Sequence, residues 1–386
     1  MRFSTTELAG HLGGELVGPD VKVDGASIDS RTVLRGQLYV PIVADRDGHA
    51  FIAAALGSGA SAYLTMHPAV GGTAIEVADT SVALMNLGML ARGRVGGVVG
   101  ITGSVGKTTT KDMLRGCLAR TFRTAASERS FNNELGLPLT LLNAPDDAQW
   151  VVLEMGARGV GHVERLARVA RPGVGIVTSV AMAHVEYFGD LDGELRPRFR
   201  LSTPWGSGEV RLALHGEQQV PNALAAAGAA LWCGVPLDDV TAALEAVTGS
   251  PLRMEVHHAP GGPVLVVDCY NANPASTEAA LRSLAALGAG RKLALLGLMA
   301  ELGAETEAEH RRVVQQAEAL GIEVVGYQTD LYGPAQVGEV ADAVALLRTL
   351  GPGDALLVKG SRVARLEDVA RAYGSAEGVQ SLVAGA

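Results

Sequence analysis

One stretch of the chain has the residue types that hold a chain of phosphates. It reads GITGSVGKTTT, from Gly100 to Thr110, and it lies between an apolar strand pattern and an amphipathic helix pattern. In such a turn, backbone amides and the helix N-terminus surround a phosphate, while Lys107 reaches the outer phosphates and Thr108 offers a hydroxyl to Mg²⁺. Five residues separate Gly100 from Gly106, one more than in ordinary P-loop kinases. We therefore predict a nucleoside triphosphate site of a different type; a glycine turn that merely closes a strand–helix unit is the weaker interpretation.

Two further residues follow apolar strand patterns. WVVLE ends in Glu154, and VGIVTS is followed by a loop that contains His184. In an open parallel sheet, ligands collect at the carboxyl ends of the strands. Glu154 is therefore our first candidate to complete an Mg²⁺ shell. His184 is either a ligand of a second metal ion or an ordinary loop histidine, and alone it favours the ordinary interpretation.

Two short polar segments have open interpretations. Asn132 and Asn133 precede a helix pattern, where adjacent amides commonly serve as caps. After the last strand pattern, ALLVKGSR places Lys359, Ser361 and Arg362 together. A solvated basic turn and an anion contact explain that turn equally well.

Another strand pattern ends in a dense set of hydrogen-bonding groups. VVDCYNANPAST places Asp268 at a strand end, with Tyr270, Asn271 and Asn273 before a helix that begins with proline. A plain Asx turn is the competing interpretation. The density of directional polar groups on one turn favours a ligand contact.

Strand and helix patterns alternate in the regions that must position these residues. The segment 1–94 contains short strands and one or two helices, among them QLYVPIV, HAFIAAALGSG and SAYLTM. From residue 95, GGVVGIT, QWVVLEMG and VGIVTS are buried strands separated by helices, and the rhythm restarts near residue 251. We predict an α/β protein with domains at 1–94, 95–250 and 251–386, the last of them Rossmann-like.

The composition excludes several classes of protein. Of the 386 residues, 48% are apolar and 19% are charged, as in globular proteins. The net charge is -9, whereas nucleic-acid-binding proteins usually carry an excess of positive charge, so nucleic acid is an unexpected partner. The three cysteines have no zinc or disulfide spacing, and neither a signal peptide nor a membrane span is visible. We expect a cytoplasmic protein, and a monomer.

Seven motifs together resemble those of the Mur ligases. In chain order they are TGSVGKTTTKDML, FNNELGLPLTLL, LEMGARGVGHV, AHVEYFGD, YNANPAST, GLMAELGAETEAEH and VKGSR. The N-terminal segment is also similar to the UDP-binding domain of that family, through Asp29-Ser30-Arg31 and Asp47-Gly48-His49. The resemblance covers nearly the whole chain and all three expected domains.

The resemblance implies an activity. Members of the family use ATP and Mg²⁺ to phosphorylate a carboxylate, which an amine then attacks to form an amide. YNANP, MAELG and VKGSR are most similar to members that add D-alanyl-D-alanine to a UDP-N-acetylmuramoyl-tripeptide in peptidoglycan synthesis. The resemblance also implies three domains that close over the substrates: a UDP-binding domain, a central ATPase domain and a C-terminal ligase domain.

The motifs and the resemblance together assign residues to three roles. The expected ATP contacts are Gly103, Ser104, Gly106, Lys107, Thr108, Thr109, Asn222, Arg253 and Asp268. The expected substrate contacts are Ser30, Arg31, Asp47, His49, Asn132, Asn133, Tyr270, Asn271, Asn273, Lys359 and Arg362. The expected catalytic residues are Lys107, Glu154 and His184, and the expected metal ligands are Thr108, Glu154 and His184.

The chain departs from the family pattern after AHVEYFGD. The family continues there with a helix whose carbamylated lysine bridges the metals, whereas this central region is shortened after Gly189. Ungapped counting puts Arg198 at the lysine position, and a guanidinium cannot form a carbamate. Gln218, Gln219 and Leu298 replace a histidine, an amide and an aspartate that are usual in the family.

This departure leaves two explanations open. Either the sequence omits a segment of a longer protein, or the chain is a shortened ligase with altered metal chemistry. A measured intact mass near 39.8 kDa would favour the second explanation.

Two other functions remain as alternatives. A Mur ligase that adds a single amino acid is the first, although no DNPR signature is present. A ligase-like nucleotide-binding protein with impaired catalysis is the second, favoured by the missing lysine segment. A simple P-loop kinase is the weakest interpretation, because it leaves the other motifs unexplained.

Overall fold

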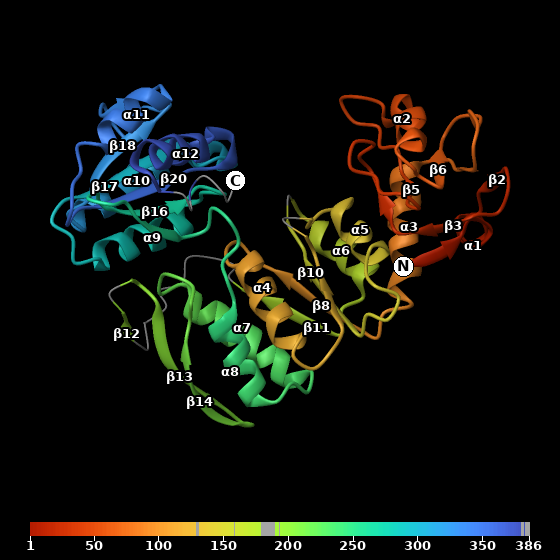
Figure 1. The fold of residues 1–386 in the computed structure, drawn as a ribbon, viewed down its shortest axis with the longest axis horizontal. Helices are drawn as coiled ribbons and strands as arrows, with labels where there is room; N and C mark the ends of the chain where they lie inside the picture. Colours follow the sequence, from red (N-terminus) through yellow and green to blue (C-terminus); the bar gives the residue numbers. More distant parts are fainter. Residues whose placement is uncertain (129–130, 158, 179–189, 193, 380–381, 383–386) are drawn as a thin grey trace. The chain divides into compact units, whose positions relative to one another are not determined.

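The computed structural model describes residues 1–128, 131–157, 159–178, 190–192, 194–379 and 382 (Figure 1). The chain divides into two compact units. The first contains Met1–Val180 and Ala225–Val235, and the second contains Ala181–Leu224 and Pro236–Ala386. Each unit is an assembly of helices on β-sheets, so the expected α/β class is confirmed. The expected boundaries near residues 94 and 250 stay predictions.

The N-terminal part of the first unit contains a five-stranded sheet in the order β2-β7-β6-β5-β4. Strands β4 to β7 are parallel, and β2 runs antiparallel to β7. A separate antiparallel pair joins β1 to β3. The elements are β1 (Arg2–Ser4), α1 (Thr5–Leu12), β2 (Glu15–Val17), β3 (Lys22–Asp24), β4 (Ala26–Ser27), β5 (Leu38–Tyr39), η1 (Gly48–Phe51), α2 (Ile52–Gly57), β6 (Ala62–Thr65), β7 (Ala74–Glu76) and α3 (Thr80–Arg92).

Helix α3 connects this sheet to the next one. It begins at an Asp79 cap, whose carboxylate accepts hydrogen bonds from the backbone N–H groups of Ser81 and Val82. Its buried leucines, Leu84 and Leu87, belong to one hydrophobic core that also contains residues of α5 and α6. The N-terminal and central parts of the first unit therefore share a core.

The central sheet has four parallel strands in the order β11-β8-β10-β9. Its elements are β8 (Gly97–Thr102), α4 (Lys107–Leu118), β9 (Thr124–Ala126), α5 (Gly136–Leu142), β10 (Trp150–Glu154), α6 (His162–Ala170) and β11 (Val174–Val177). Helix α4 buries one apolar face, which includes Met113, Leu114 and Cys117, as its pattern predicts. The carboxyl ends of all four strands lie at the same edge.

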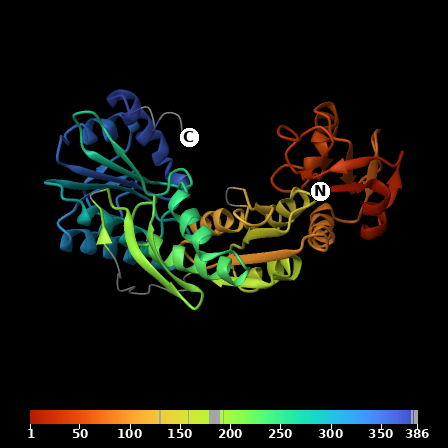
Figure 2. The same cartoon turned by 60° about the horizontal axis from the view of Figure 1, so that its bottom comes forward.

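A smaller antiparallel sheet, β12-β13-β14, opens the second unit (Figure 2). Helix α8 packs against β14. The unit boundary falls within α7, so part of the expected 95–250 span groups with the C-terminal unit. The elements are β12 (Asp190–Leu191), β13 (Pro197–Thr203), β14 (Gly206–Arg211), α7 (Gln219–Trp232) and α8 (Leu237–Ala246).

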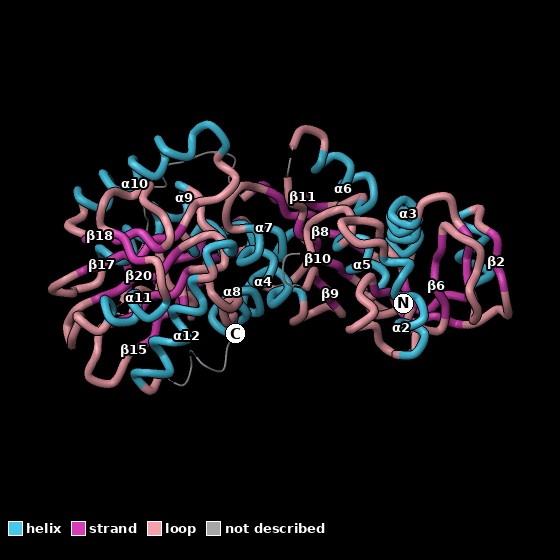
Figure 3. The backbone as a smooth tube through the Cα atoms, turned by 90° about the horizontal axis from the view of Figure 1, so that it is seen from above, coloured by secondary structure: helices cyan, strands magenta, loops and turns pink. Residues whose placement is uncertain are grey.

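The C-terminal sheet has six strands in the order β15-β16-β20-β17-β18-β19, and only β15 is antiparallel. Helices α9 and α10 cover one face, and α11 and α12 cover the other (Figure 3). The elements are β15 (Glu255–His258), β16 (Val264–Asp268), α9 (Pro274–Ala286), β17 (Lys292–Gly297), η2 (Gly303–Glu305), α10 (Thr306–Ala319), β18 (Glu323–Tyr327), β19 (Gln336–Val337), α11 (Val340–Leu347), β20 (Ala355–Lys359), η3 (Arg362–Ala364) and α12 (Leu366–Glu377).

This arrangement is the one expected of a Rossmann-like domain. A sheet that carries helices on both faces has a crevice at the carboxyl ends of its strands. No helix among the described residues is long and apolar enough to cross a membrane.

Candidate active site

The loop between β8 and α4 has the backbone geometry of a phosphate loop. Gly103 has a φ of 136° and Gly106 a φ of 83°, backbone conformations that residues with a Cβ rarely adopt. Gly106 is also the N-cap of α4, where no side chain of the described residues makes a capping hydrogen bond. The amides of the first helical turn therefore point at the loop, with the positive end of the helix dipole.

Lys107, the first residue of α4, lies over this loop. Its Nζ donates to the carbonyl oxygen of Gly103 at 2.6 Å and is 3.3 Å from that of Ser104. Thr178, directly after β11, donates to the carbonyl oxygen of Val105 at 2.5 Å. Sequence reasoning missed Thr178, whose only signal was its place at a strand end. Thr109, an expected ATP contact, follows Thr108 in the first turn of α4.

Glu154 ends β10 beside Ile101 of β8, so its carboxylate reaches the phosphate-loop edge of the sheet. The Thr108 hydroxyl donates to Oε2 at 2.9 Å, and Asn132 Nδ2 donates to Oε1 at 2.9 Å. The Glu154 side chain is 2% exposed. Among the described residues, no cationic side chain forms an ion pair with it. The site therefore holds a buried carboxylate that accepts hydrogen bonds from two neutral side chains, Thr108 and Asn132, an arrangement that a cation would complete.

The two adjacent asparagines have different environments. Asn132 reaches Glu154, whereas the Asn133 Oδ1 accepts hydrogen bonds from the backbone N–H groups of Leu135 and Gly136 at the start of α5. Asn133 therefore matches the cap interpretation, and Asn132 belongs to the carboxylate site. His184, the expected second metal ligand, lies outside the described residues.

Behind the carboxylate lies a buried lysine that sequence reasoning also missed. Lys111 is 3% exposed, and its Nζ donates to the carbonyl oxygen of Ser127 at 2.8 Å. The Ser127 hydroxyl in turn accepts from the backbone N–H of Glu154 at 3.2 Å. The signal was available, because Lys111 interrupts the apolar face of α4.

The expected uridine-side residues gather at one edge of the N-terminal sheet. Parallel strands β4, β5 and β6 end side by side, and the Asp29–Arg31 loop and the Asp47–His49 turn follow the first two. Both Arg31 Nε and Nη2 donate to the Asp29 carboxylate, at 2.9 and 2.6 Å. These hydrogen bonds lower the pKa of Asp29 to about 2. Ser30 lies between the paired residues and is half-buried.

His49 has its two ring nitrogens engaged at the same edge. Its Nε2 accepts the backbone N–H of Met66 at 3.1 Å, so Nδ1 carries the hydrogen that Asp47 Oδ1 accepts at 2.6 Å. The backbone amide of His49 also lowers the pKa of Asp47. His67 completes a group of three possible metal ligands whose atoms lie within 4.8 Å. The tautomer of His49 makes this group a poor fit for a cation, because neither ring nitrogen has a lone pair to offer.

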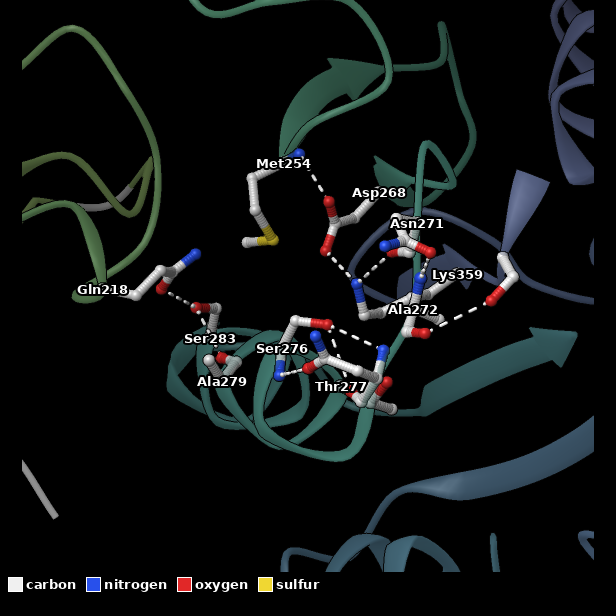
Figure 4. A network of polar contacts seen from close by, with 12 residues as sticks. Gln218, Met254, Asp268, Asn271, Ala272, Ser276, Thr277, Ala279, Ser283 and Lys359 are labelled. Atoms are coloured by element: carbon white, nitrogen blue, oxygen red, sulfur yellow. Dashed lines mark hydrogen bonds and ion pairs between the residues drawn. The ribbon is translucent and has the colours of Figure 1, made fainter. Parts of the chain in front are cut away.

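The C-terminal sheet carries a second carboxylate at a strand end, and this one is partly buried. Asp268 ends β16, and Lys359, 1% exposed at the end of β20, donates to its Oδ2 at 2.6 Å (Figure 4). The same Lys359 Nζ donates to the carbonyl oxygen of Asn271 at 3.1 Å, and Asp268 Oδ1 accepts the backbone N–H of Met254 at 3.3 Å. Lys359 therefore joins two loops and is not a solvated basic residue.

Other expected residues surround this pair. The Arg253 guanidinium lies over the Tyr270 ring, 4.3 Å from its centroid, a cation–π contact. Asn273 caps α9 in a capping box with Ser276, as the Asx interpretation predicts. The structure thus brings Arg253, Asp268, Tyr270, Asn271 and Lys359 together.

Two further expected residues have partners outside that cluster. Arg362 pairs with Glu367 at 3.1 Å. Asn222 of α7 donates through Nδ2 to Gln219 Oε1 at 2.9 Å. The amide pair of Gln219 and Asn222 thus orders the first turn of the helix.

Ungapped counting was wrong about the environment of Arg198. The residue lies on strand β13, opposite Arg211 of β14, and not on a helix. Alternate residues of β13 are buried, and Arg198 is among the exposed ones. Arg198 is therefore no positional substitute for a helical, metal-bridging lysine.

Comparisons with known proteins agree with this architecture. The Mur ligase middle domain matches residues 101–196, and the Mur ligase glutamate ligase domain matches residues 252–362. The UDP-N-acetylmuramoyl-tripeptide–D-alanyl-D-alanine ligase of Escherichia coli K12 is 32% identical, over 95% of this chain and 97% of its own length. The enzyme of the same name from Mycobacterium tuberculosis H37Rv is 33% identical, over 89% and 91%.

Solved structures are similar as well. A crystal structure of MurF from Acinetobacter baumannii superimposes with a TM-score of 0.86 at 25% identity, over 97% of this chain and 99% of that one. MurF from Thermotoga maritima, solved in complex with ADP, has the same fold with a TM-score of 0.79 at 23% identity, over 93% and 99%.

The match to the Escherichia coli relative also bears on the departure after Gly189. It spans 440 aligned positions, more than the 386 residues of this chain, so the relative has residues with no counterpart here. The domains, the order of the motifs and the identity over almost the full length nevertheless agree, and the chain belongs to the Mur ligase family.

Proposed function

We propose that this protein is an ATP-dependent ligase that joins D-alanyl-D-alanine to a UDP-N-acetylmuramoyl-tripeptide in peptidoglycan precursor synthesis. The observation that carries the proposal is the meeting of Lys107, Thr108 and Glu154 at one sheet edge, in a chain with full-length relatives of that name. A reaction on these nucleotide-linked precursors would take place in the cytoplasm, and a monomer would suffice for it.

The phosphate loop would bind the triphosphate of ATP. The amides after Gly106 and the Lys107 ammonium neutralise charge on the outer phosphates, which is the main demand of phosphoryl transfer. The Thr108 hydroxyl and the Glu154 carboxylate are hard oxygen donors 2.9 Å apart, so they fit Mg²⁺, which would neutralise phosphate charge when bound. We assign His184, as in the family resemblance, to a second metal ion.

The N-terminal sheet edge would bind the UDP end of the tripeptide substrate. Ser30 and Arg31 offer a hydroxyl and an exposed guanidinium, while the hydrogen-bonded Asp47–His49 pair stiffens the neighbouring turn. Asn132 and Asn133 at the central edge would hold the peptide end. The terminal carboxylate of the tripeptide substrate would then take the γ-phosphoryl group of ATP, with ADP as the leaving group.

The C-terminal cluster would hold the acceptor and part of the nucleotide. Arg253 and Asp268 are our candidates for the ribose or phosphates, together with Asn222 for adenine. Tyr270, Asn271, Asn273, Lys359 and Arg362 are our candidates for the dipeptide side. The amine attacks the acyl phosphate, phosphate leaves, and the amide remains.

A three-component assay tests the proposal. Phosphate release should require ATP, UDP-N-acetylmuramoyl-tripeptide and D-alanyl-D-alanine together. Release of phosphate with a free amino acid in place of the dipeptide would instead assign the chain to a Mur ligase of single amino acids.

A second candidate is a nucleotide- and UDP-sugar-binding protein without turnover. The strand position of Arg198 favours it, because an exposed strand residue does not stand in for the helical, metal-bridging lysine that the family resemblance implies. Tight binding of ATP and of the UDP-linked tripeptide, with no phosphate release, would support this candidate.

A further inference from the structure

Glu301, in the loop after β17, has a left-handed backbone conformation with a φ of 67°. Such a conformation is unfavourable for a residue with a Cβ, and it persists where the surroundings over-determine it. Two residues later, Gly303 also has a positive φ, 57°, which a glycine adopts without a steric penalty; Glu301 has no such freedom. Glu301 itself is exposed.

Two buried side chains hold the backbone amides directly before Glu301. The Met299 N–H donates to His310 Nε2 at 3.0 Å, and the Ala300 N–H donates to Ser361 Oγ at 2.9 Å. The His310 Nδ1 lies 2.6 Å from the carbonyl oxygen of Thr306, so Nδ1 carries the hydrogen and Nε2 is the acceptor. The loop is thereby fixed from α10 on one side and from the segment after β20 on the other.

Ser361 also places this loop beside the other polar loops of the sheet. Its backbone N–H donates to the carbonyl oxygen of Leu298 at 2.9 Å, and its hydroxyl donates to the carbonyl oxygen of Ala272 at 3.2 Å. Strands β16, β20 and β17 are neighbours, so the loops after them share one carboxyl edge. That edge is where an open α/β sheet binds ligands.

The two acids of this edge differ in their partners. Asp268 is engaged by Lys359, whereas Glu301 forms no ion pair with any described residue. Glu301 is exposed at the sheet edge where ligands bind, after a backbone segment that buried side chains hold in place. The substrate proposed for this domain carries an ammonium group, which a carboxylate attracts. We propose that Glu301 binds the ammonium group of the incoming dipeptide and that His310 and Ser361 are its positioning residues.

This inference rests on the proposed function, and steady-state kinetics of the full chain separate the two. Turnover by the wild-type protein tests the function alone. Glu301→Gln should then raise the KM for D-alanyl-D-alanine about ten- to a hundredfold, the loss of one charge-assisted hydrogen bond, and leave the KM for ATP and for the tripeptide unchanged. Glu305→Gln, which removes an exposed charge four residues away, is the matched control. Equal dipeptide KM values for the two variants would overturn the proposal.

The positioning role has a separate readout. His310→Leu removes the acceptor and should raise the dipeptide KM, whereas His310→Gln offers a carbonyl acceptor and should restore it. Burial lowers the pKa of His310, and Tyr332, with its ring 4.8 Å away, is the titratable side chain packed against it. The wild-type kcat/KM for the dipeptide should therefore gain an acid limb below the ordinary histidine range that His310→Gln lacks. Identical acid limbs, or equal changes in all three KM values, would contradict this role; if His310→Leu does not fold, the pH profiles still decide.

Discussion

Two carboxylates at strand ends, the buried Glu154 and the partly buried Asp268, have opposite surroundings in this molecule. Glu154 of the central sheet accepts hydrogen bonds from the neutral groups of Thr108 and Asn132. Asp268 of the C-terminal sheet is paired with the buried ammonium of Lys359. Both acids follow apolar strands, so their sequence contexts are alike. Their partners, which come from distant parts of the chain, make the difference.

The difference separates a carboxylate whose charge a bound cation would balance from one whose charge is already balanced within the protein. A buried carboxylate with neutral partners keeps an unbalanced charge, and a bound cation lowers its free energy. A buried carboxylate with a lysine partner is already balanced, and removal of that partner leaves a costly isolated charge. Loss of Glu154 should therefore show chiefly in turnover, whereas loss of one partner of the Asp268–Lys359 pair should lower stability in addition to any effect on ligand binding.

Breaking the C-terminal ion pair should have the largest effect. Lys359→Met leaves the partly buried Asp268 unpaired, so the free energy of unfolding should fall by about 3 kcal/mol. Urea denaturation measures this. The double variant with Asp268→Asn should recover much of the loss, and failure to recover any of it would mean that the two side chains are not coupled.

Neutralising the Glu154 carboxylate should have the next largest effect, but on the rate of turnover and not on stability. Glu154→Gln keeps hydrogen-bonding groups and removes the charge that would hold Mg²⁺, so kcat should fall about a hundred- to a thousandfold. Phosphate release and the melting temperature should be measured together. Glu164→Gln, at an exposed site on α6, is the control. A large loss of stability with little change in kcat would reverse the contrast between the two acids.

Removing the cap of α9 should have an intermediate effect near the C-terminal acid. Asn273→Ala deletes the acceptor for the Ser276 N–H, so the free energy of unfolding should fall by about 1 kcal/mol. If Asn273 also touches substrate, the KM for one substrate will rise, whereas a purely structural cap will leave every KM unchanged. Denaturation and steady-state kinetics on the same preparation give both values.

Disruption of the exposed Arg31–Asp29 pair should have the smallest effect. Arg31→Gln removes the hydrogen bonds that depress the pKa of Asp29, so this pKa should rise from about 2 toward the ordinary aspartate range. Because the folded pKa lies below the unfolded one, the stabilisation is present above about pH 4 and is lost as the pH falls through 2. Carboxyl titration by NMR measures the shift. An unchanged pKa would show that the Arg31–Asp29 contact does not persist in solution.

The sequence by itself determined the α/β class, the strand–helix alternation, the phosphate loop and the family. These features depend on local patterns, namely apolar periodicity, glycines at turns, and short motifs at strand ends. It also indicated correctly that Asp268 and Glu154 end strands.

Only the tertiary structure decided what those residues contact. Lys359 could have been a solvated basic residue, and Asn273 a ligand contact; the fold made them a buried ion pair and a helix cap. Thr178 and His310 carried too little local signal to be selected, whereas Lys111 was missed although it interrupts the apolar face of α4. The order of the strands within a sheet determines which residues far apart in sequence become hydrogen-bond partners, and no local pattern encodes that order.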